Sequence, residues 1–83
     1  EEFALLLPHT NVAGAHEFAE RIRHLVEVNP IAIEGQPPLM ITVSVGVAEW
    51  YVGEDDFDPV MGRADQALYD AKANGRNRVE SRN

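Results

Sequence analysis

The sequence predicts an α+β domain with the element order β-α-β-β-α-β, in which helices pack on a sheet that contains antiparallel pairs. Three observations predict it. Residues 11–28 have helical spacing, residues 39–49 alternate like a strand, and residues 58–74 carry helix start and stop signals. Short apolar segments precede, separate and follow these stretches. The order matches the split β-α-β arrangement.

The first strand is predicted at residues 3–7, a continuous apolar run that Pro8 stops and that suits a strand buried on both faces. The first helix follows, with Thr10 or Asn11 as its N-cap, and Asn29-Pro30 ends it. Its predicted buried stripe consists of Ala15, Phe18, Ala19, Ile22, Leu25 and Val26.

The middle of the chain predicts two strands around a turn. Residues 31–33 form a short apolar segment, and residues 35–38 have the composition of a turn. In residues 39–49, bulky side chains occupy one face and small ones the other. Gly46 lies on the small face, so another part of the chain can approach its backbone closely.

An acidic loop at residues 50–57 leads to the second helix. Asp58 is the expected N-cap and Pro59 the first helical residue, and Gly75 suits the left-handed residue after the helix. The predicted inner stripe consists of Met61, Ala64, Leu68 and Ala71. Residues 78–80 form the last predicted strand.

Length, cysteine content and net charge limit the classes of protein to which this chain can belong. The chain has 83 residues, of which 45% are hydrophobic, and it lacks an initiator Met, so we expect part of one domain cut from a longer protein. Without cysteine it is neither a disulfide scaffold nor a Cys-based zinc site, and it fits a cytoplasmic protein. A formal charge of -7 makes nucleic acid a poor general partner.

Two groups of residues carry possible chemistry. Glu1 and Glu2 are adjacent carboxylates that could hold a hard cation such as Mg²⁺, although, judged alone, two terminal glutamates are more often simply solvated. Lys72, Arg76 and Arg78 concentrate basic charge that suits a triphosphate. The alternative for this group is that it only complements the dipole at a helix C-terminus.

Taken together, these segments resemble the C-terminal part of a diguanylate cyclase (GGDEF) domain, cut within its signature turn. The resemblance rests on Glu1-Glu2-Phe3, on the strand at residues 41–48 and on residues 63–79, RADQALYDAKANGRNRV. It covers essentially the whole chain. It implies a ferredoxin-like, palm-like nucleotidyl cyclase fold, of which residues 1–83 would be an incomplete part.

The resemblance implies an enzyme of bacterial second-messenger signalling. Diguanylate cyclases condense two GTP molecules into cyclic di-GMP and release pyrophosphate, with Mg²⁺ or Mn²⁺ as cofactor. Two domains face each other, so a homodimer is implied, and a sensory domain is expected in the parent protein, which could be tethered to a membrane through another domain.

The resemblance also implies roles for individual residues. Glu1 would be a catalytic metal ligand, and Glu2 would assist the metal site or the attacking hydroxyl. Lys72 and Arg76 match the pair that contacts substrate phosphates. Arg21 matches a position that contributes to a secondary, product-binding inhibitory site in some members.

The part of the family domain that precedes the signature is expected to carry a metal-binding aspartate, the guanine-reading residues and a central strand. That strand would lie between residues 3–7 and residues 41–48. Because the metal-binding aspartate and the guanine-reading residues are absent, we expect the 83-residue chain alone to be inactive. Without the central strand, two apolar strands would keep unpaired backbone, so we expect the chain to close the gap by pairing these strands directly or by exchanging strands with a second copy.

Two other functions stay open on the sequence alone. One is a degenerate, non-catalytic GGDEF module that binds nucleotide or regulates a larger protein. The other is a small ferredoxin-like protein-interaction domain with an acidic surface and no chemistry.

Overall fold

The computed structural model describes residues 3–82, which form two helices and two strands in the order α-β-α-β. Helix α1 spans Val12–Val28, strand β1 Val45–Ala48, helix α2 Phe57–Ala73 and strand β2 Val79–Arg82. The α+β class is confirmed.

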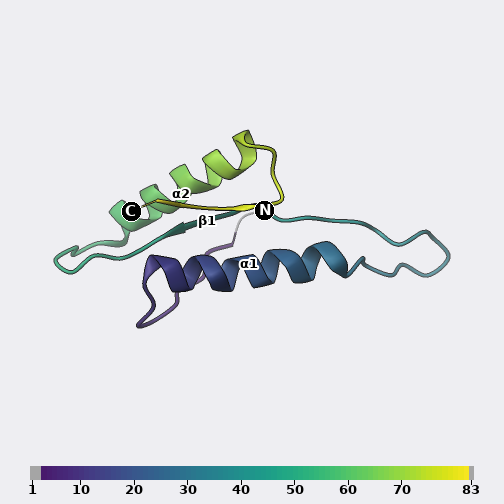
Figure 1. Ribbon diagram of the computed structural model, residues 1–83, viewed down its shortest axis with the longest axis horizontal. Coiled ribbons are helices and arrows are strands. Elements are labelled where there is room, and N and C mark those ends of the chain that lie inside the picture. Colours follow the sequence, from purple (N-terminus) through teal and green to yellow (C-terminus); the bar gives the residue numbers. More distant parts are fainter. Residues whose placement is uncertain (1–2, 83) are drawn as a thin grey trace.

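The two strands are parallel neighbours, with Val45 opposite Val79 and Ala48 opposite Arg82. Helix α2 connects them, as a parallel pair requires. Both helices contact both strands and neither contacts the other, so α1 and α2 cover opposite faces of this small sheet (Figure 1).

Local signals set both ends of α1. Asn11 has extended backbone angles and accepts a 2.8 Å hydrogen bond from the Gly14 amide through its side chain, which makes it the N-cap. Asn29 is the C-cap, so the helix ends before Pro30 as predicted.

Helix α2 begins earlier than predicted. Its N-cap is Asp56, whose carboxylate accepts from the Asp58 amide at 3.4 Å, and Asp58 lies within the first turn. The prediction that Asp58 is the cap was therefore wrong, because Asp56 has the extended backbone that a cap needs. Neither α1 nor α2 has the length and hydropathy that a membrane crossing requires.

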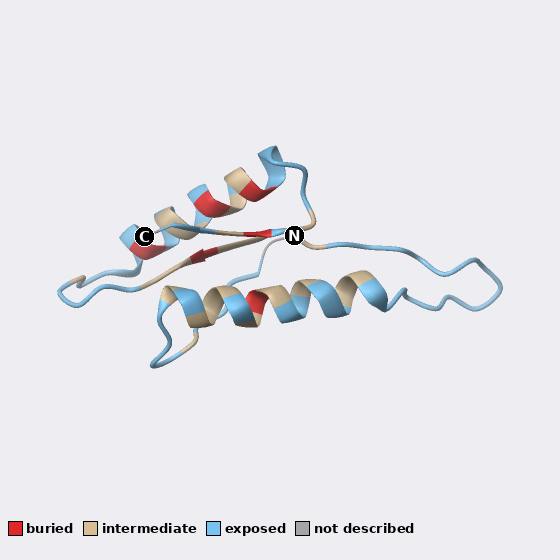
Figure 2. Cartoon of the chain, in the orientation of Figure 1, coloured by how far each residue is buried: buried red, intermediate tan, exposed pale blue. Residues whose placement is uncertain are grey.

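The buried core is small and built from small side chains. Ala19, Val47 and Val79 form its centre between α1 and the sheet. On the other face of the sheet, the buried residues of α2 are Val60, Ala67 and Ala71 (Figure 2). Met61 is 39% exposed, so the inner stripe of α2 is displaced from the predicted one.

Gly46 permits direct contact between α2 and β1. A Cβ atom at this position would lie 2.2 Å from the Ala64 carbonyl oxygen and 2.3 Å from the Leu68 nitrogen. These distances are far below van der Waals contact, so only glycine fits, and the predicted close approach is confirmed.

Three predicted strand segments differ from the structure. Residues 3–7 form no strand, and Phe3 is 91% exposed rather than buried. Residues 31–33 contribute one antiparallel bridge, between Ile31 and Leu39. Of residues 39–49, only β1 is a strand. The reason is the same for all three segments. An extended segment becomes a strand only where its backbone pairs with a partner strand, and among these segments only β1 lies beside β2.

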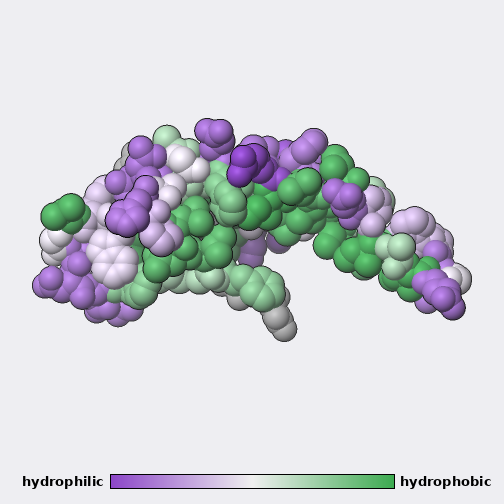
Figure 3. Space-filling view, turned by 90° about the horizontal axis from the view of Figure 1, so that it is seen from below, coloured by the Kyte–Doolittle hydropathy of each residue, from purple (hydrophilic) through white to green (hydrophobic). Residues whose placement is uncertain are grey.

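Residues 29–44 form a long loop that projects from the body of the molecule, and the bridge between Ile31 and Leu39 joins its two sides (Figure 1). Figure 3 shows hydrophobic side chains gathered in the middle of one face and continuing toward one end of the molecule. The large apolar residues that stay exposed include Leu5, Leu6, Ile22, Leu25, Ile31, Ile33, Leu39, Met40 and Ile41.

Candidate phosphate-binding site

The C-terminal end of α2 is closed by a Schellman motif. The Arg76 amide donates to the Ala71 carbonyl at 2.9 Å, and the Gly75 amide donates to the Lys72 carbonyl at 3.4 Å. Gly75 has a φ of 122°, which a residue without a side chain adopts readily. This motif reverses the chain immediately after the helix.

Lys72 and Arg76 lie on either side of this reversal. Lys72 is in the last turn of α2, Arg76 follows the glycine, and both are exposed. The structure therefore places both predicted phosphate contacts at one end of one helix. An ammonium and a guanidinium at the same end of a helix are groups that suit an anionic ligand.

The backbone of this segment is unusual beyond Gly75. Arg76 has a φ of 64° and Asn77 a φ of 50°, so three consecutive residues are left-handed. Residues other than glycine rarely adopt this conformation, although asparagine tolerates it better than most. Interactions elsewhere must therefore hold the segment in place.

Asn77 supplies those interactions, which sequence reasoning missed. Its amide nitrogen Nδ2 donates to Glu27 Oε2 at 2.7 Å, and its Oδ1 accepts from Arg23 at 2.9 Å. Its backbone N–H donates to Ser44 Oγ at 3.2 Å. The segment after α2 is thus fastened to α1 and to the residue before β1.

Arg23 and its acidic neighbours form the other half of this cluster. Arg23 pairs with Glu20 at 2.5 Å and with Glu27 at 3.0 Å, and its side chain is only 14% exposed. The hydrogen bonds that Arg23 donates to Glu20 and Glu27 raise the pKa of Arg23. Arg23 lowers the pKa of Glu20, while the Asn77 amide and then Arg23 lower the pKa of Glu27.

The sequence carried a partial signal for this cluster. Glu20, Arg23 and Glu27 have the i, i+3 and i+4 spacing of helical ion pairs. No local pattern could bring Asn77 to them, because it lies 50 residues from Glu27 along the chain.

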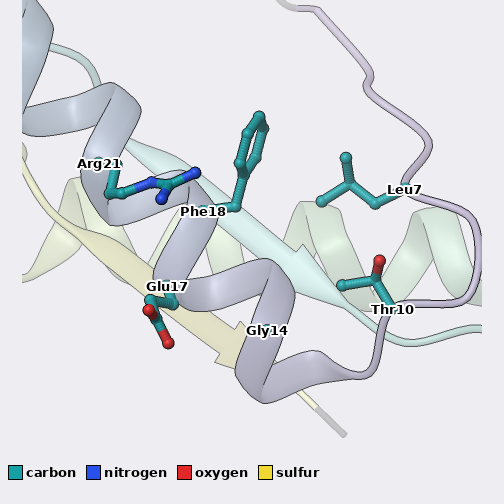
Figure 4. A pocket seen from close by; sticks show the side chains of 6 residues that line it. All are labelled: Leu7, Thr10, Gly14, Glu17, Phe18 and Arg21. Carbon is teal, nitrogen blue, oxygen red and sulfur yellow. The ribbon is translucent and has the colours of Figure 1, made fainter.

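Arg21 lies on a different part of α1 from Arg23. It lines an open pocket of about 340 Å³ with Leu7, Thr10, Gly14, Glu17 and Phe18 (Figure 4). Its guanidinium carbon lies 5.7 Å from the centre of the Phe18 ring. The arginine expected at a secondary inhibitory site is therefore exposed beside an aromatic ring, where a planar ligand could stack.

A separate ion pair, between Arg63 and Glu54, orders the loop between β1 and α2. Arg63 pairs with Glu54 at 2.7 Å, donates to the Glu49 carbonyl at 2.6 Å and lies 4.6 Å from the centre of the Tyr51 ring. Hydrogen bonding between Arg63 and Glu54 raises the pKa of Arg63 and lowers that of Glu54. Glu49 in turn accepts from the Val12 amide at 2.8 Å, which links this loop to the start of α1.

Glu1 and Glu2, the predicted metal ligands, lie outside the described residues. Within residues 3–82, no three His, Cys, Asp or Glu side chains gather as potential ligands of a metal ion. The donor chemistry of Glu1 and Glu2 fits Mg²⁺ or Mn²⁺, which prefer carboxylate oxygens.

Known proteins are similar to this chain in sequence and in fold. The model of the family described as "Diguanylate cyclase, GGDEF domain" matches residues 1–78. The chain is 40% identical over 79 residues to Diguanylate cyclase A of Treponema denticola, covering 95% of this chain and 21% of that protein. It is 48% identical over 79 residues to Diguanylate cyclase DgcM of Escherichia coli K12, covering 95% of this chain and 18% of that protein.

Solved structures agree with these relatives. The GGDEF domain of DgcB from Caulobacter crescentus, in complex with c-di-GMP, superposes with a TM-score of 0.81 at 36% identity and covers 90% of this chain and 43% of its own. SiaD from Pseudomonas aeruginosa, in complex with its activator SiaC, gives a TM-score of 0.81 at 37% identity and covers 92% of this chain and 28% of its own. The chain thus spans about a fifth of the curated relatives' length. By sequence and by fold, it belongs to the GGDEF domain family of diguanylate cyclases.

Proposed function

We propose that residues 1–83 are the C-terminal portion of an active diguanylate cyclase domain that condenses two GTP molecules into cyclic di-GMP. The observation that supports this proposal most directly is that Lys72 and Arg76 lie on either side of the chain reversal at the end of α2 and are both exposed. This arrangement suits the triphosphate of GTP, because a guanidinium can bind two phosphate oxygens and an ammonium can neutralise a third.

In the proposed reaction, the 3′-hydroxyl of one GTP attacks the α-phosphorus of the other, and pyrophosphate leaves. A second, reciprocal attack closes the ring, so two GTP yield one cyclic di-GMP and two pyrophosphates. Lys72 and Arg76 hold the β- and γ-phosphates and stabilise the charge that develops on the leaving group. Two domains, each with one GTP, must face each other in a homodimer.

Glu1 and Glu2 are proposed to complete the site at the start of the chain. A divalent cation held by Glu1 would neutralise phosphate charge and polarise the α-phosphate. Glu2 would assist the metal site or orient the attacking hydroxyl. Both roles come from the family signature.

The family also motivates proposals about regulation and location. The DgcB domain was solved with c-di-GMP and SiaD with an activator protein. We propose that cyclic di-GMP binds this domain as an inhibitor through Arg21, and that a sensory domain or activator in the parent protein controls it. We place the domain in the cytoplasm.

The proposal is tested on the full-length parent protein incubated with GTP and Mg²⁺, with cyclic di-GMP measured by chromatography. Arg76→Ala and Lys72→Ala are each expected to raise the KM for GTP about tenfold or more, the loss typical of a charge-assisted hydrogen bond. Glu1→Ala is expected to abolish turnover while the melting temperature stays unchanged.

Arg82→Gln is the matched control, because it removes an arginine that pairs with Asp70 and is not one of the proposed phosphate contacts. A wild-type protein that binds GTP but makes no product would support the alternative of a non-catalytic regulatory module. The 83-residue chain alone is expected to make no cyclic di-GMP, and product from that chain would contradict the proposed division of the active site.

A further inference from the structure

Asn77 is the residue through which α1 holds the loop that carries Arg76. Its side chain lies between Arg23, which donates to Oδ1 at 2.9 Å, and Glu27, which accepts from Nδ2 at 2.7 Å. The two bonds run in opposite directions, so both the acceptor and the donor of one amide are used. A carboxylate at this position would lose the donor, and an aliphatic side chain would lose both.

Arg23 and Glu27, the two residues of α1 that hold Asn77, are themselves restrained by ion pairs. Arg23 is mostly buried and binds two carboxylates of its own helix, at i−3 and i+4. Three charged groups and one amide therefore satisfy one another. Such a cluster restrains its members more than any single pair does.

The loop needs such restraint because of its backbone. Arg76 and Asn77 are both left-handed, with φ of 64° and 50°. Nothing in an arginine side chain favours that conformation. The bonds from Asn77 to α1, together with that from its backbone to Ser44, offset the cost and select one loop conformation.

We propose that Asn77, clasped by Arg23 and Glu27, is a positioning residue that orients Arg76 toward the triphosphate of GTP. This inference rests on the proposed function, since it assigns a role within the same phosphate site. Asn77 itself needs no contact with the nucleotide. Its effect reaches the ligand only through Arg76.

A double-mutant cycle in the full-length parent protein tests this. The probe is 3′-deoxy-GTP with Mg²⁺, which lacks the attacking hydroxyl, and its affinity is measured by calorimetry. Asn77→Ala is expected to weaken binding about tenfold when Arg76 is present and less than about twofold in the Arg76→Ala background. A purely structural role for Asn77 would give the same loss in both backgrounds and would overturn the proposal.

The variant Asn77→Gly distinguishes the contribution of the side-chain amide from that of the left-handed backbone conformation. Glycine adopts positive φ freely but makes no bond to Arg23 or Glu27. The proposal expects this variant to bind the probe about as weakly as Asn77→Ala, and wild-type affinity would overturn it. Because the glycine variant keeps the loop geometry accessible, it decides the question even where Asn77→Ala does not fold.

Arg82→Gln, which removes an arginine ion pair elsewhere, should bind the probe like wild type. Different results would refute the proposed function and the positioning role of Asn77. A wild-type protein that does not bind 3′-deoxy-GTP refutes the proposed function and this inference with it. A wild-type protein that binds it normally, with Asn77 variants that bind equally well, refutes this inference alone.

Discussion

At the scale of single residues, Gly46 shows how one small side chain sets the distance between two elements. The backbone of α2 lies directly against it, and a Cβ atom at this position would overlap the Ala64 carbonyl oxygen and the Leu68 amide nitrogen. Backbone cannot move aside as a flexible side chain can. The approach of α2 to β1, and therefore the position of Lys72 and Arg76, depends on this glycine.

Gly46→Ala is expected to destabilise the domain by about 1–3 kcal/mol or more, because the new methyl group would overlap backbone atoms of α2. The measurement is the free energy of unfolding of the parent domain from a denaturant titration. Gly62→Ala is the matched control, since a Cβ there meets nothing within 4 Å and alanine favours a helix by about 0.5–1 kcal/mol. A Gly46→Ala protein as stable as wild type would contradict the close packing of α2 on β1.

At the scale of elements, the segment after α2 depends on α1, which is remote in the sequence. The Schellman motif is local and follows from Gly75, but it determines only how the chain leaves the helix. The direction that the chain then takes is set by Arg23 and Glu27 through Asn77. Helix α1 thus supports the site without contributing a proposed phosphate contact.

This coupling is expected to weaken in acid. The Asn77 amide and Arg23 hold the pKa of Glu27 below its ordinary value of 4.5. A group whose pKa is lowered by folding stabilises the fold above its unfolded pKa, and that contribution is lost as the pH falls through the folded value. The Asn77–Glu27 bond should therefore hold at neutral pH and open as the pH falls from about 4.5 downward.

The measurement is an NMR titration of the Asn77 side-chain amide in the parent domain. Its chemical shifts should move below pH 4.5 in the wild-type protein. In Glu27→Gln, which keeps an acceptor but does not titrate, that movement should be lost or much reduced. Identical titrations in the two proteins would show that Glu27 does not govern the bond.

At the scale of the whole molecule, the described residues bury little apolar surface for their hydrophobic content. The buried core residues are all alanine or valine, while leucines, isoleucines and Phe3 stay exposed. Among residues 3–82, the sheet consists of two strands, so each strand keeps an unpaired edge. Unpaired edges and exposed apolar side chains together favour association.

Residues 3–7 form no strand, so they do not close the gap by pairing directly with β1. The 83-residue chain prepared alone is accordingly expected to self-associate by strand exchange, as judged by light scattering after size-exclusion chromatography. It should also bind an apolar dye more strongly than the parent protein does, because more hydrophobic surface is accessible. A monomer with full helical and sheet signal in circular dichroism would contradict this expectation.

Helices were more predictable than strands in this chain, for a physical reason. A helix satisfies its backbone within itself, so Asn11, Pro30 and Gly75 were sufficient to locate three of the four helix ends. A strand needs a partner, and periodicity could not show that residues 3–7 would have none among the described residues. The single bridge between Ile31 and Leu39 illustrates the same limit.

The sequence by itself determined the family, the two helices and the residues Lys72 and Arg76, because these depend on motifs and on interactions within one segment. Only the tertiary structure decided which extended segments pair and which side chains stay exposed. It also revealed that Asn77 contacts Arg23 and Glu27, which lie 54 and 50 residues away along the chain. Hydrogen bonds between distant segments form only when the fold brings donor and acceptor together, so a local pattern cannot encode them.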